Sequence, residues 1–361
     1  MVILKKQLLL VYVLMILLLF SGCSVSETSP ENETFTFTDS CGREVELPVN
    51  ITKVAPSGSM AQIILYTAAP DALAGWSSNP GGIQFAYFPE KYRDLPEFGQ
   101  FYGRNVSLNM EALIAAAPDV IIDMGDKKPT AAGDMDSIQE QTGIPAIFIE
   151  ATFDTYPEAY RTLGKLLGAG EQTELIARYI EGAIADAAAA RAGLFAEDPV
   201  TVMFGTGESG LDCNARGSIH ATVIEVAGAT NAIVVPEVSN AGGGNTISME
   251  QLMLFDPDVI LFSSGGPYET VGSDPLWSGL SAIENGRYYE IPFGPYHFIA
   301  NPPSVNQVIG IKWLGNLLYP DLYPYDITAE LQEFYSLFWH YELSAEEARA
   351  LLANSTFKGS M

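Results

Sequence analysis

The stretch SLNMEALIAAAPDVII at residues 107–122 returns as TISMEQLMLFDPDVILF at residues 246–262. Each copy contains Met-Glu-x-Leu, four further positions and then Pro-Asp-Val-Ile. The apolar residues before the proline recur at helical spacing. Pro118 or Pro257 ends that short helix, because proline lacks a backbone donor and restricts the residue before it. The apolar run that follows does not alternate with polar residues, which is typical of a parallel strand covered on both faces. The duplication therefore predicts two similar α/β lobes.

The surrounding sequence extends this pattern. Residues 51–60, ITKVAPSGSM, indicate a strand and a small-residue loop, which lead into a helix and then a second strand ending at Trp76. Residues 199–206 open the same pattern in the second half. Between the halves, residues 171–195 predict an Ala-rich helix of about 25 residues, which would span roughly 35 Å. We expect an α/β protein with two similar lobes, parallel-rich sheets and a long linking helix.

The start of the chain resembles an export signal. Lys5 and Lys6 precede an apolar run at residues 8–20, which ends in Ser-Gly-Cys at Cys23. The run is too short to span a membrane comfortably and is typical of a signal peptide. The Ser-Gly-Cys ending resembles a lipobox, which implies lipid attachment at Cys23 and retention at the outer face of the cytoplasmic membrane. Phe20 replaces the usual leucine, which leaves simple secretion or an uncleaved anchor open.

These features divide the chain into five segments. The tether is poor in large apolar residues, and the N-terminal lobe opens with an alternating edge hairpin. The predicted boundaries are a signal peptide at 1–22, a flexible tether at 23–34, an N-terminal α/β lobe at 35–170, the linking helix at 171–195 and a C-terminal α/β lobe at 196–361.

Composition excludes some classes of partner. The formal net charge is −26, and it becomes −28 once Lys5 and Lys6 leave with the signal peptide. Such a surface repels nucleic acid and anionic lipid, so we expect neither as a partner. A local basic pocket could still hold an anionic ligand, because electrostatic screening acts over roughly 8 Å. Cys41 and Cys213 lie far apart in sequence, and we expect two separate thiols rather than a disulfide.

Together these features resemble the class III periplasmic binding proteins, the solute receptors of ABC importers for ferric siderophores, haem and cobalamin. The resemblance covers about residues 35–353. It is most specific in ITKVAPSGS, GQFYGRNVSLNMEALIAAAPDVII, GSIHATVIEVAGATNAI, TISMEQLMLFDPDVILF and the linking helix. The resemblance implies a monomeric binding protein with no cofactor of its own, whose partners are an ABC permease dimer with its ATPase and a small-molecule metal chelate.

The resemblance also assigns roles to residues. In this family the glutamate of each Met-Glu-x-Leu helix docks on the permease, which implies docking roles for Glu111 and Glu250. Two equivalent carboxylates on duplicated lobes would suit a pseudo-symmetric partner. Each could instead serve only its own helix, because an acidic residue in the first turn is favoured by the helix dipole.

The ligand of this family lies between the lobes, against loops at the carboxyl ends of strands. The sequence departs from better-known members at Ile299, where an arginine often stands, and at Gly244, which leaves the class of chelate open. Either Phe101 or Tyr102 matches the aromatic residue that stacks on the ligand in this family. The positions that the resemblance and the loop placement assign to ligand binding are Ser57, Ser59, Trp76, Tyr102, Arg216, Tyr296 and His297.

Three alternatives remain open at this stage. A bare transition metal is disfavoured because the chain contains only His220, His297 and His340, too few for a dedicated site. An oxyanion such as molybdate or tungstate would be centred on Arg216. A secreted enzyme is less favoured, because neither Gly-rich loop matches a phosphate-binding or nucleophile motif, and we assign no catalytic residue.

Overall fold

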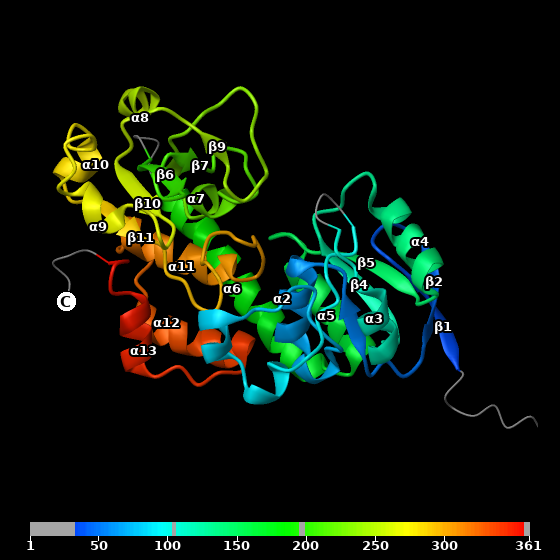
Figure 1. Cartoon of the computed structure of the whole chain (residues 1–361). Helices are drawn as coiled ribbons and strands as arrows, with labels where there is room; N and C mark the ends of the chain where they lie inside the picture. Colours follow the sequence, from blue (N-terminus) through cyan, green and yellow to red (C-terminus); the bar gives the residue numbers. More distant parts are fainter. Residues whose placement is uncertain (1–32, 103–105, 195–198, 357–361) are drawn as a thin grey trace, which may run out of the picture.

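The structure is a computed structural model that describes residues 33–102, 106–194 and 199–356. Two α/β lobes are joined by a long helix, α6 (Figure 1). The predicted signal peptide, the lipid-attachment residue Cys23 and nearly all of the tether lie outside the described residues. The fold class predicted from the sequence is confirmed.

The N-terminal lobe is built on three parallel strands in the order β3 (Val54–Pro56), β4 (Val120–Gly125) and β5 (Ala146–Glu150). All six residues of β4 are buried, as its continuous apolar run predicts. The α-helices of this lobe are α2 (Ser59–Ala68), α3 (Met110–Ala116), α4 (Ala131–Thr142) and α5 (Tyr156–Leu167).

The edge of this lobe carries the predicted hairpin. Strand β1 (Thr34–Thr38) pairs antiparallel with β2 (Glu44–Pro48), and Gly42 in the turn adopts a φ of 80°. The predicted strand ending at Trp76 is wrong: Leu73 and Trp76 form only isolated bridges, because each meets a different neighbour. Short 3₁₀ turns lie before and after these bridges, at η2 (Pro70–Ala72), η3 (Gly82–Tyr87) and η4 (Glu90–Tyr92).

Helix α6 (Gly170–Gly193) has 24 residues and runs from the N-terminal lobe towards the C-terminal lobe (Figure 1). Its observed bounds agree closely with the predicted 171–195, and residue 195 lies outside the described residues. Helix α5 packs closely against it, because Gly164 faces Thr173. A Cβ at Gly164 would lie 2.1 Å from the Thr173 hydroxyl, so glycine is required at this crossing.

The C-terminal lobe repeats the parallel arrangement around β6 (Thr201–Thr206). Strand β6 pairs in parallel with β8 and β10, β10 pairs in parallel with β11, and β7 and β9 extend the sheet in antiparallel orientation. The remaining strands are β7 (Asp212–Cys213), β8 (Thr230–Asn231), β9 (Asn245–Thr246), β10 (Val259–Phe262) and β11 (Tyr288–Glu290). Its helices are α7 (Thr222–Val226), α8 (Met249–Phe255), α9 (Tyr268–Val271), α10 (Ser281–Glu284) and α11 (Gln307–Leu318).

The sequence repeat corresponds to a structural repeat. Helices α3 and α8 each have seven residues, and the residue before each proline, Ala117 or Asp256, adopts a left-handed conformation. The aspartate of each Pro-Asp-Val-Ile motif ties neighbouring strands together. Asp119 accepts the backbone N–H and hydroxyl of Thr52, and Asp258 accepts those of Thr201. The aspartate of the motif therefore has a structural role of its own, in addition to the helix and strand that the motif specifies.

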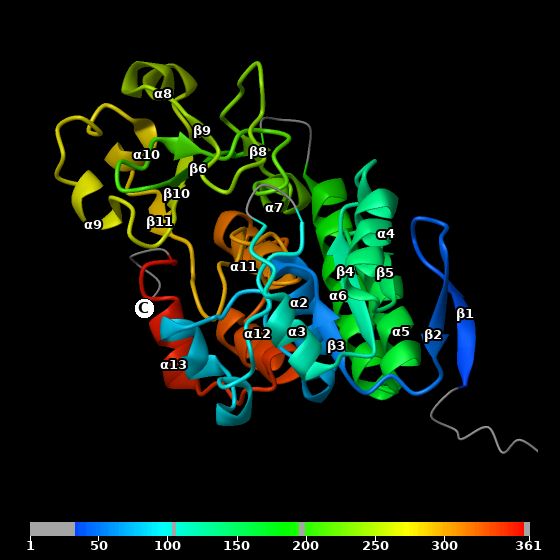
Figure 2. The same cartoon turned by 45° about the vertical axis from the view of Figure 1, so that its right-hand side comes forward.

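The C-terminal segment returns to the N-terminal lobe. It consists of α12 (Ile327–Phe334), the π-helical turn η5 (Tyr335–Trp339) and α13 (Ala345–Leu351), and η5 packs against α2 (Figure 2). Ser344 and Glu347 form a capping box at the start of α13, as the spacing of a serine and a glutamate three residues apart predicts. One hydrophobic core therefore runs through both lobes instead of stopping at α6.

Candidate ligand-binding site

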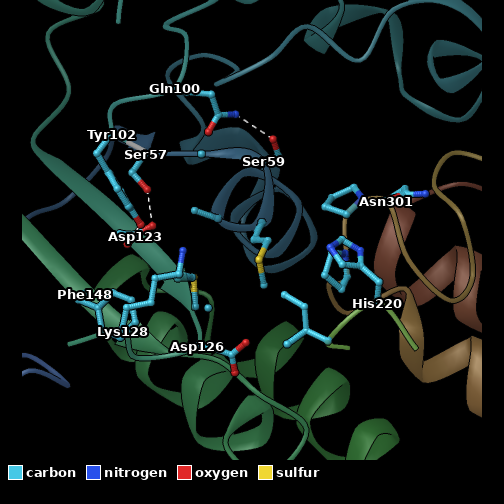
Figure 3. A pocket seen from close by; sticks show the side chains of 18 residues that line it. Ser57, Ser59, Gln100, Tyr102, Asp123, Asp126, Lys128, Phe148, His220 and Asn301 are labelled. Atoms are coloured by element: carbon cyan, nitrogen blue, oxygen red, sulfur yellow. Dashed lines mark hydrogen bonds between the residues drawn. The ribbon is translucent and has the colours of Figure 1, made fainter. Parts of the chain in front are cut away.

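A cavity of about 570 Å³ lies where the strand ends of the N-terminal lobe face two loops of the C-terminal lobe (Figure 3). The N-terminal side is formed by the residues after β3, by the first turn of α2, by the end of β4 and by Gln100 and Tyr102. The C-terminal side is formed by Ile219 and His220 before α7 and by the 301–303 loop. Ligands of parallel α/β sheets bind at such strand ends.

Asp123 is the most buried charged group of the cavity, with an exposed fraction of 4%. It is the fourth residue of β4, so the strand itself fixes its position. One carboxylate oxygen accepts the hydroxyl of Ser57 and the other accepts the hydroxyl of Tyr102 (Figure 3). Burial raises the pKa of Asp123, and the two hydroxyl donors oppose this by stabilising the carboxylate.

Tyr102 is held as a neutral hydroxyl donor. Burial, and next the negative charge of Asp123, raise its pKa above the ordinary value of 10.0. Above this group, the side-chain amide of Gln100 donates to the Ser59 hydroxyl at 2.8 Å. Gly58 allows this approach, because a Cβ there would lie 2.9 Å from the Gln100 amide oxygen. The resulting wall presents hydroxyl and amide groups on a rigid backbone.

His220 and Asn301 face this wall from the C-terminal lobe (Figure 3). The His220 Nε2 lies 3.2 Å from the carbonyl of Asn240, which can only accept, so Nε2 carries the proton. The buried Nδ1 is then an acceptor, and it has no hydrogen-bond partner among the described residues. Burial lowers the pKa of His220, which favours this neutral form. Asn301 adopts a φ of 59°, an unusual conformation of the kind that clusters at ligand-binding sites.

A second compartment of about 290 Å³ adjoins the first. The two share Met60, Asp126, Ile219 and Pro303, so they form one continuous cleft. Asp154 adds a further carboxylate to the second compartment. The cleft can therefore hold a ligand larger than a single ion with its hydration shell.

The family model for periplasmic binding proteins matches residues 54–295, which is more than half of the chain. The chain belongs to this family. The binding protein is 27% identical to an ABC transporter solute binding protein from Sulfurospirillum deleyianum, with a TM-score of 0.80 over 88% of this chain and 99% of the other. It is 25% identical to a periplasmic solute binding protein from Veillonella parvula, with a TM-score of 0.73 over 90% of this chain and 98% of the other.

A curated relative is more distant in sequence. The Fe(3+)-citrate-binding protein YfmC of Bacillus subtilis is 23% identical over 282 residues, which cover 76% of this chain and 85% of the relative. These similarities make the chain a solute-binding protein of the class III architecture, with a linking helix between its lobes.

Of the residues assigned to ligand binding from the sequence, Ser57, Ser59 and Tyr102 line the cleft of this binding protein. The alternative aromatic, Phe101, is only 5% exposed and packs in the core of the N-terminal lobe. The structure does not place Trp76 in the cleft. Its ring is 1% exposed, and its indole N–H donates to the carbonyl of Tyr92 at 2.9 Å. Trp76 is therefore a core residue.

Tyr296 and His297 are also placed in the core rather than the cleft. The Tyr296 ring packs on Trp339, and its hydroxyl accepts from Gln62 at 3.3 Å. The His297 ring stacks on Phe204, and its Nδ1 accepts the backbone N–H groups of residues 299 and 300. Trp339 of the C-terminal segment covers the Tyr296 ring, whereas Phe204 of β6 covers the His297 ring. A Gly-Pro-rich aromatic loop can line a core as readily as a ligand.

Arg216 does not line the cleft either. Its guanidinium donates twice to the carbonyl of Asn231, at 2.7 and 3.0 Å, and so joins the loop after β7 to β8. The predicted oxyanion site centred on this residue is therefore not assembled. The hydrogen bonds of its guanidinium stabilise the C-terminal sheet instead.

The cleft residues that the sequence reasoning missed are Asp123, Asp126, Lys128, Gln100, His220 and Asn301. One available signal would have found three of them. The run VIIDMGDKK ends the first repeat strand, and polar residues at the carboxyl end of a parallel strand commonly face the ligand. His220 carries no such signal, because a single histidine before a short helix is as readily a capping or packing residue as a ligand-binding one.

Two further features concern metal and docking. No group of three or more His, Cys, Asp or Glu side chains able to hold a metal ion exists within residues 33–102, 106–194 and 199–356.

Glu111 and Glu250 are both exposed in the first turns of α3 and α8. Hydrogen bonds from its own backbone N–H and from Ser248 lower the pKa of Glu250, so it is a carboxylate at neutral pH.

The remaining predictions from the sequence concern cysteines and the membrane. Cys41 and Cys213 are separate free thiols, as expected, with Cys213 buried. Among the helices of the described part of the chain, none is long and apolar enough to cross a membrane. Cys23 lies outside that part, so the lipid anchor stays a prediction.

Proposed function

We propose that the protein is an extracytoplasmic substrate-binding lipoprotein of an ABC importer, which captures a chelated metal between its lobes and delivers it to a permease. The observation that carries the proposal is the continuous cleft lined by polar groups from both lobes. Compartments of about 570 and 290 Å³ fit a small organic ligand, because ligand pockets commonly measure roughly 300–1,000 Å³. The candidate chelates are ferric siderophores, haem and cobalamin.

Size and chemistry disfavour the smaller alternatives. A bare ion or a tetrahedral oxyanion needs only a few times the roughly 30 Å³ that one water molecule takes up in the liquid. The described residues form no metal-ligand cluster, and Arg216, the group that would suit an oxyanion, is bound to Asn231. A chelate brings its own metal ligands, so the protein needs only to enclose it.

Delivery to the permease is proposed to use Glu111 and Glu250. Each is an exposed carboxylate beside an exposed apolar side chain on the same short helix. Ile114 on α3 is 61% exposed and Leu254 on α8 is 86% exposed. A charged group flanked by apolar surface on both lobes suits a partner with two equivalent binding sites.

The function is tested by titrating the full-length protein with ferric siderophores, haem, cobalamin and molybdate, using tryptophan fluorescence and calorimetry. We expect at least one chelate to bind with a Kd of about 1 μM or lower, and molybdate to show no binding at that level. Tight binding of molybdate together with failure of every chelate would overturn the proposal. Hydrolysis or other conversion of a bound chelate would point to an enzyme instead.

A further inference from the structure

The charges of the cleft are mainly negative. Its first compartment contains Asp123, Asp126 and Lys128, and the second adds Asp154. Three carboxylates therefore face one ammonium group. No arginine among residues 33–102, 106–194 and 199–356 lines either compartment. A cleft built for a polyanionic chelate would present bidentate guanidinium groups, which match carboxylate and catecholate oxygens.

The hydrogen-bonding groups of the cleft also disfavour an anionic ligand. The Asp123 oxygens already accept from Ser57 and Tyr102, so the two hydroxyls are occupied and do not serve as free donors. The His220 Nδ1 is a buried acceptor without a partner among the described residues. The cleft therefore contains a buried acceptor that a hydrogen-bond donor on the ligand would satisfy.

Asp126 is the carboxylate best placed to meet such a ligand. It is exposed, it follows directly after β4, and it lines both compartments (Figure 3). Within the described part of the chain, the Asp126 side chain forms no hydrogen bond, and no cationic nitrogen lies within 4.0 Å of it. Its charge is thus available at the junction of the cleft, in contrast to that of Asp123.

Resting on the function proposed above, we infer that the ligand is a metal chelate of net positive or neutral charge that carries hydrogen-bond donors, and that Asp126 binds a cationic donor group of it. The net charge of −26 over the whole chain acts in the same direction, because it attracts cationic chelates and repels anionic ones. Carboxylate-rich and catecholate chelates, which are anionic, are then poor ligands.

The test compares four ferric probes on the full-length protein by calorimetry. They are a linear trihydroxamate with a free amine, which is cationic, the same chelate with the amine acetylated, which is neutral, and two anionic complexes, dicitrate and a tricatecholate. We expect the cationic probe to bind best, with about tenfold weaker binding after acetylation, and the anionic probes to bind more weakly than either. Tighter binding of an anionic probe would overturn the inference while leaving the proposed function intact.

Substitutions distinguish the effect of the Asp126 charge on binding from the effect of the net charge of the protein. Asp126→Asn should weaken binding of the cationic probe about tenfold. The cationic and the acetylated probe should then bind this variant with equal affinity. Asp321→Asn removes the same charge from an exposed residue outside both compartments and should change neither value. Lys128→Gln should tighten binding of the cationic probe, whereas an anionic ligand would bind this variant more weakly.

Two further outcomes contradict the inference. If Asp126→Asn and Asp321→Asn have equal effects, Asp126 does not contact the ligand. If none of the four probes binds, and haem and cobalamin also fail, the proposed function falls and the inference falls with it. The two failures are distinguishable, because the first leaves chelate binding in place.

Discussion

His297 illustrates how burial alone changes the chemistry of a residue. It is 3% exposed, its ring lies 5.3 Å from that of Phe204, and its Nδ1 accepts two backbone N–H groups. A protonated ring would lose the acceptor and place a charge in the core. Burial, with a smaller contribution from His220, therefore lowers the pKa of His297 from 6.5 to about 3.

This depressed pKa predicts a pH-dependent stability. Between about pH 6.5 and pH 3 the unfolded state binds a proton that the folded state rejects, so stability is full above this window and is lost as the pH falls through it. The loss from this residue approaches about 1.4 kcal/mol per pH unit. We expect His297→Asn, which keeps an acceptor, to be less stable at pH 7 but to show a smaller slope. Urea unfolding at several pH values between 7.5 and 5 measures this, and an unchanged slope would contradict it.

At the scale of elements, the repeated helix and strand carry two separable functions. The Asp of each Pro-Asp-Val-Ile motif accepts hydrogen bonds from the neighbouring chain segment, so this part of the repeat serves folding. The Glu of each Met-Glu-x-Leu motif is exposed, and neither side chain is required by the core. This division explains why one short repeat contains one acidic residue that is bonded to the neighbouring chain segment and another that lies exposed on its helix.

The docking proposal predicts the effect of a double substitution. Glu111→Ala with Glu250→Ala should abolish uptake in cells while leaving chelate affinity unchanged, because neither residue lines the cleft. Truncating one side of a charge pair desolvated on docking costs roughly 2–5 kcal/mol. Uptake of radiolabelled chelate by cells and calorimetry on the purified variant provide the two readouts.

A matched control is available on other helices. Glu140 on α4 and Glu269 on α9 are exposed, one in each lobe, and the double variant Glu140→Ala with Glu269→Ala should transport normally. Full uptake by the Glu111 and Glu250 double variant would contradict docking. Loss of chelate affinity in that variant would place the two residues in the ligand site instead.

At the scale of the whole molecule, the lobes share an aromatic core. Trp339 of η5 packs against Tyr66 of α2, Phe88 and Tyr296, and His340 reaches the carbonyl of Thr67 at 3.1 Å. The C-terminal segment thus fastens the lobes at a second place besides α6. We expect only a small movement between the lobes on ligand binding, since both connections are packed.

The shared core predicts a large effect of one truncation. Trp339 is 1% exposed, and Trp339→Ala should lower the free energy of unfolding by about 3–5 kcal/mol, as is typical of a buried large aromatic residue. Phe35→Ala provides the comparison, because Phe35 on the edge hairpin is 36% exposed and should cost about 1 kcal/mol or less. Equal losses for the two variants in urea unfolding would contradict a shared core.

The location of the molecule is tested at Cys23. Changing Cys23→Ser should release the protein from the membrane fraction or leave its precursor unprocessed, because the lipid would have no sulfur to attach to. A single lipid chain binds membranes only marginally, so we expect two chains on the native protein. Mass spectrometry of the N-terminus and fractionation of cells measure both. Normal processing and retention of the variant would exclude lipidation at this residue.

Features that depend on local patterning are predictable from the sequence. The duplicated motif predicted two α/β lobes, because apolar spacing specifies helix or strand and a proline marks the boundary between them. The linking helix α6 and the capping box of Ser344 and Glu347 were predicted closely for the same reason. Each of these depends on residues that are near one another in the chain.

Which polar and aromatic residues meet in the cleft depends on how distant segments of the chain pack together. Trp76, Tyr296 and His297 pack in cores, while Asp123 and His220 face the cavity from opposite lobes. The physical reason is that burial depends on contacts between distant segments. Tyr66 and Trp339 are 273 positions apart and are joined by a hydrogen bond, and Trp339 also packs on Tyr296. No local pattern could show that the C-terminal segment covers Tyr296 and keeps it out of the cleft.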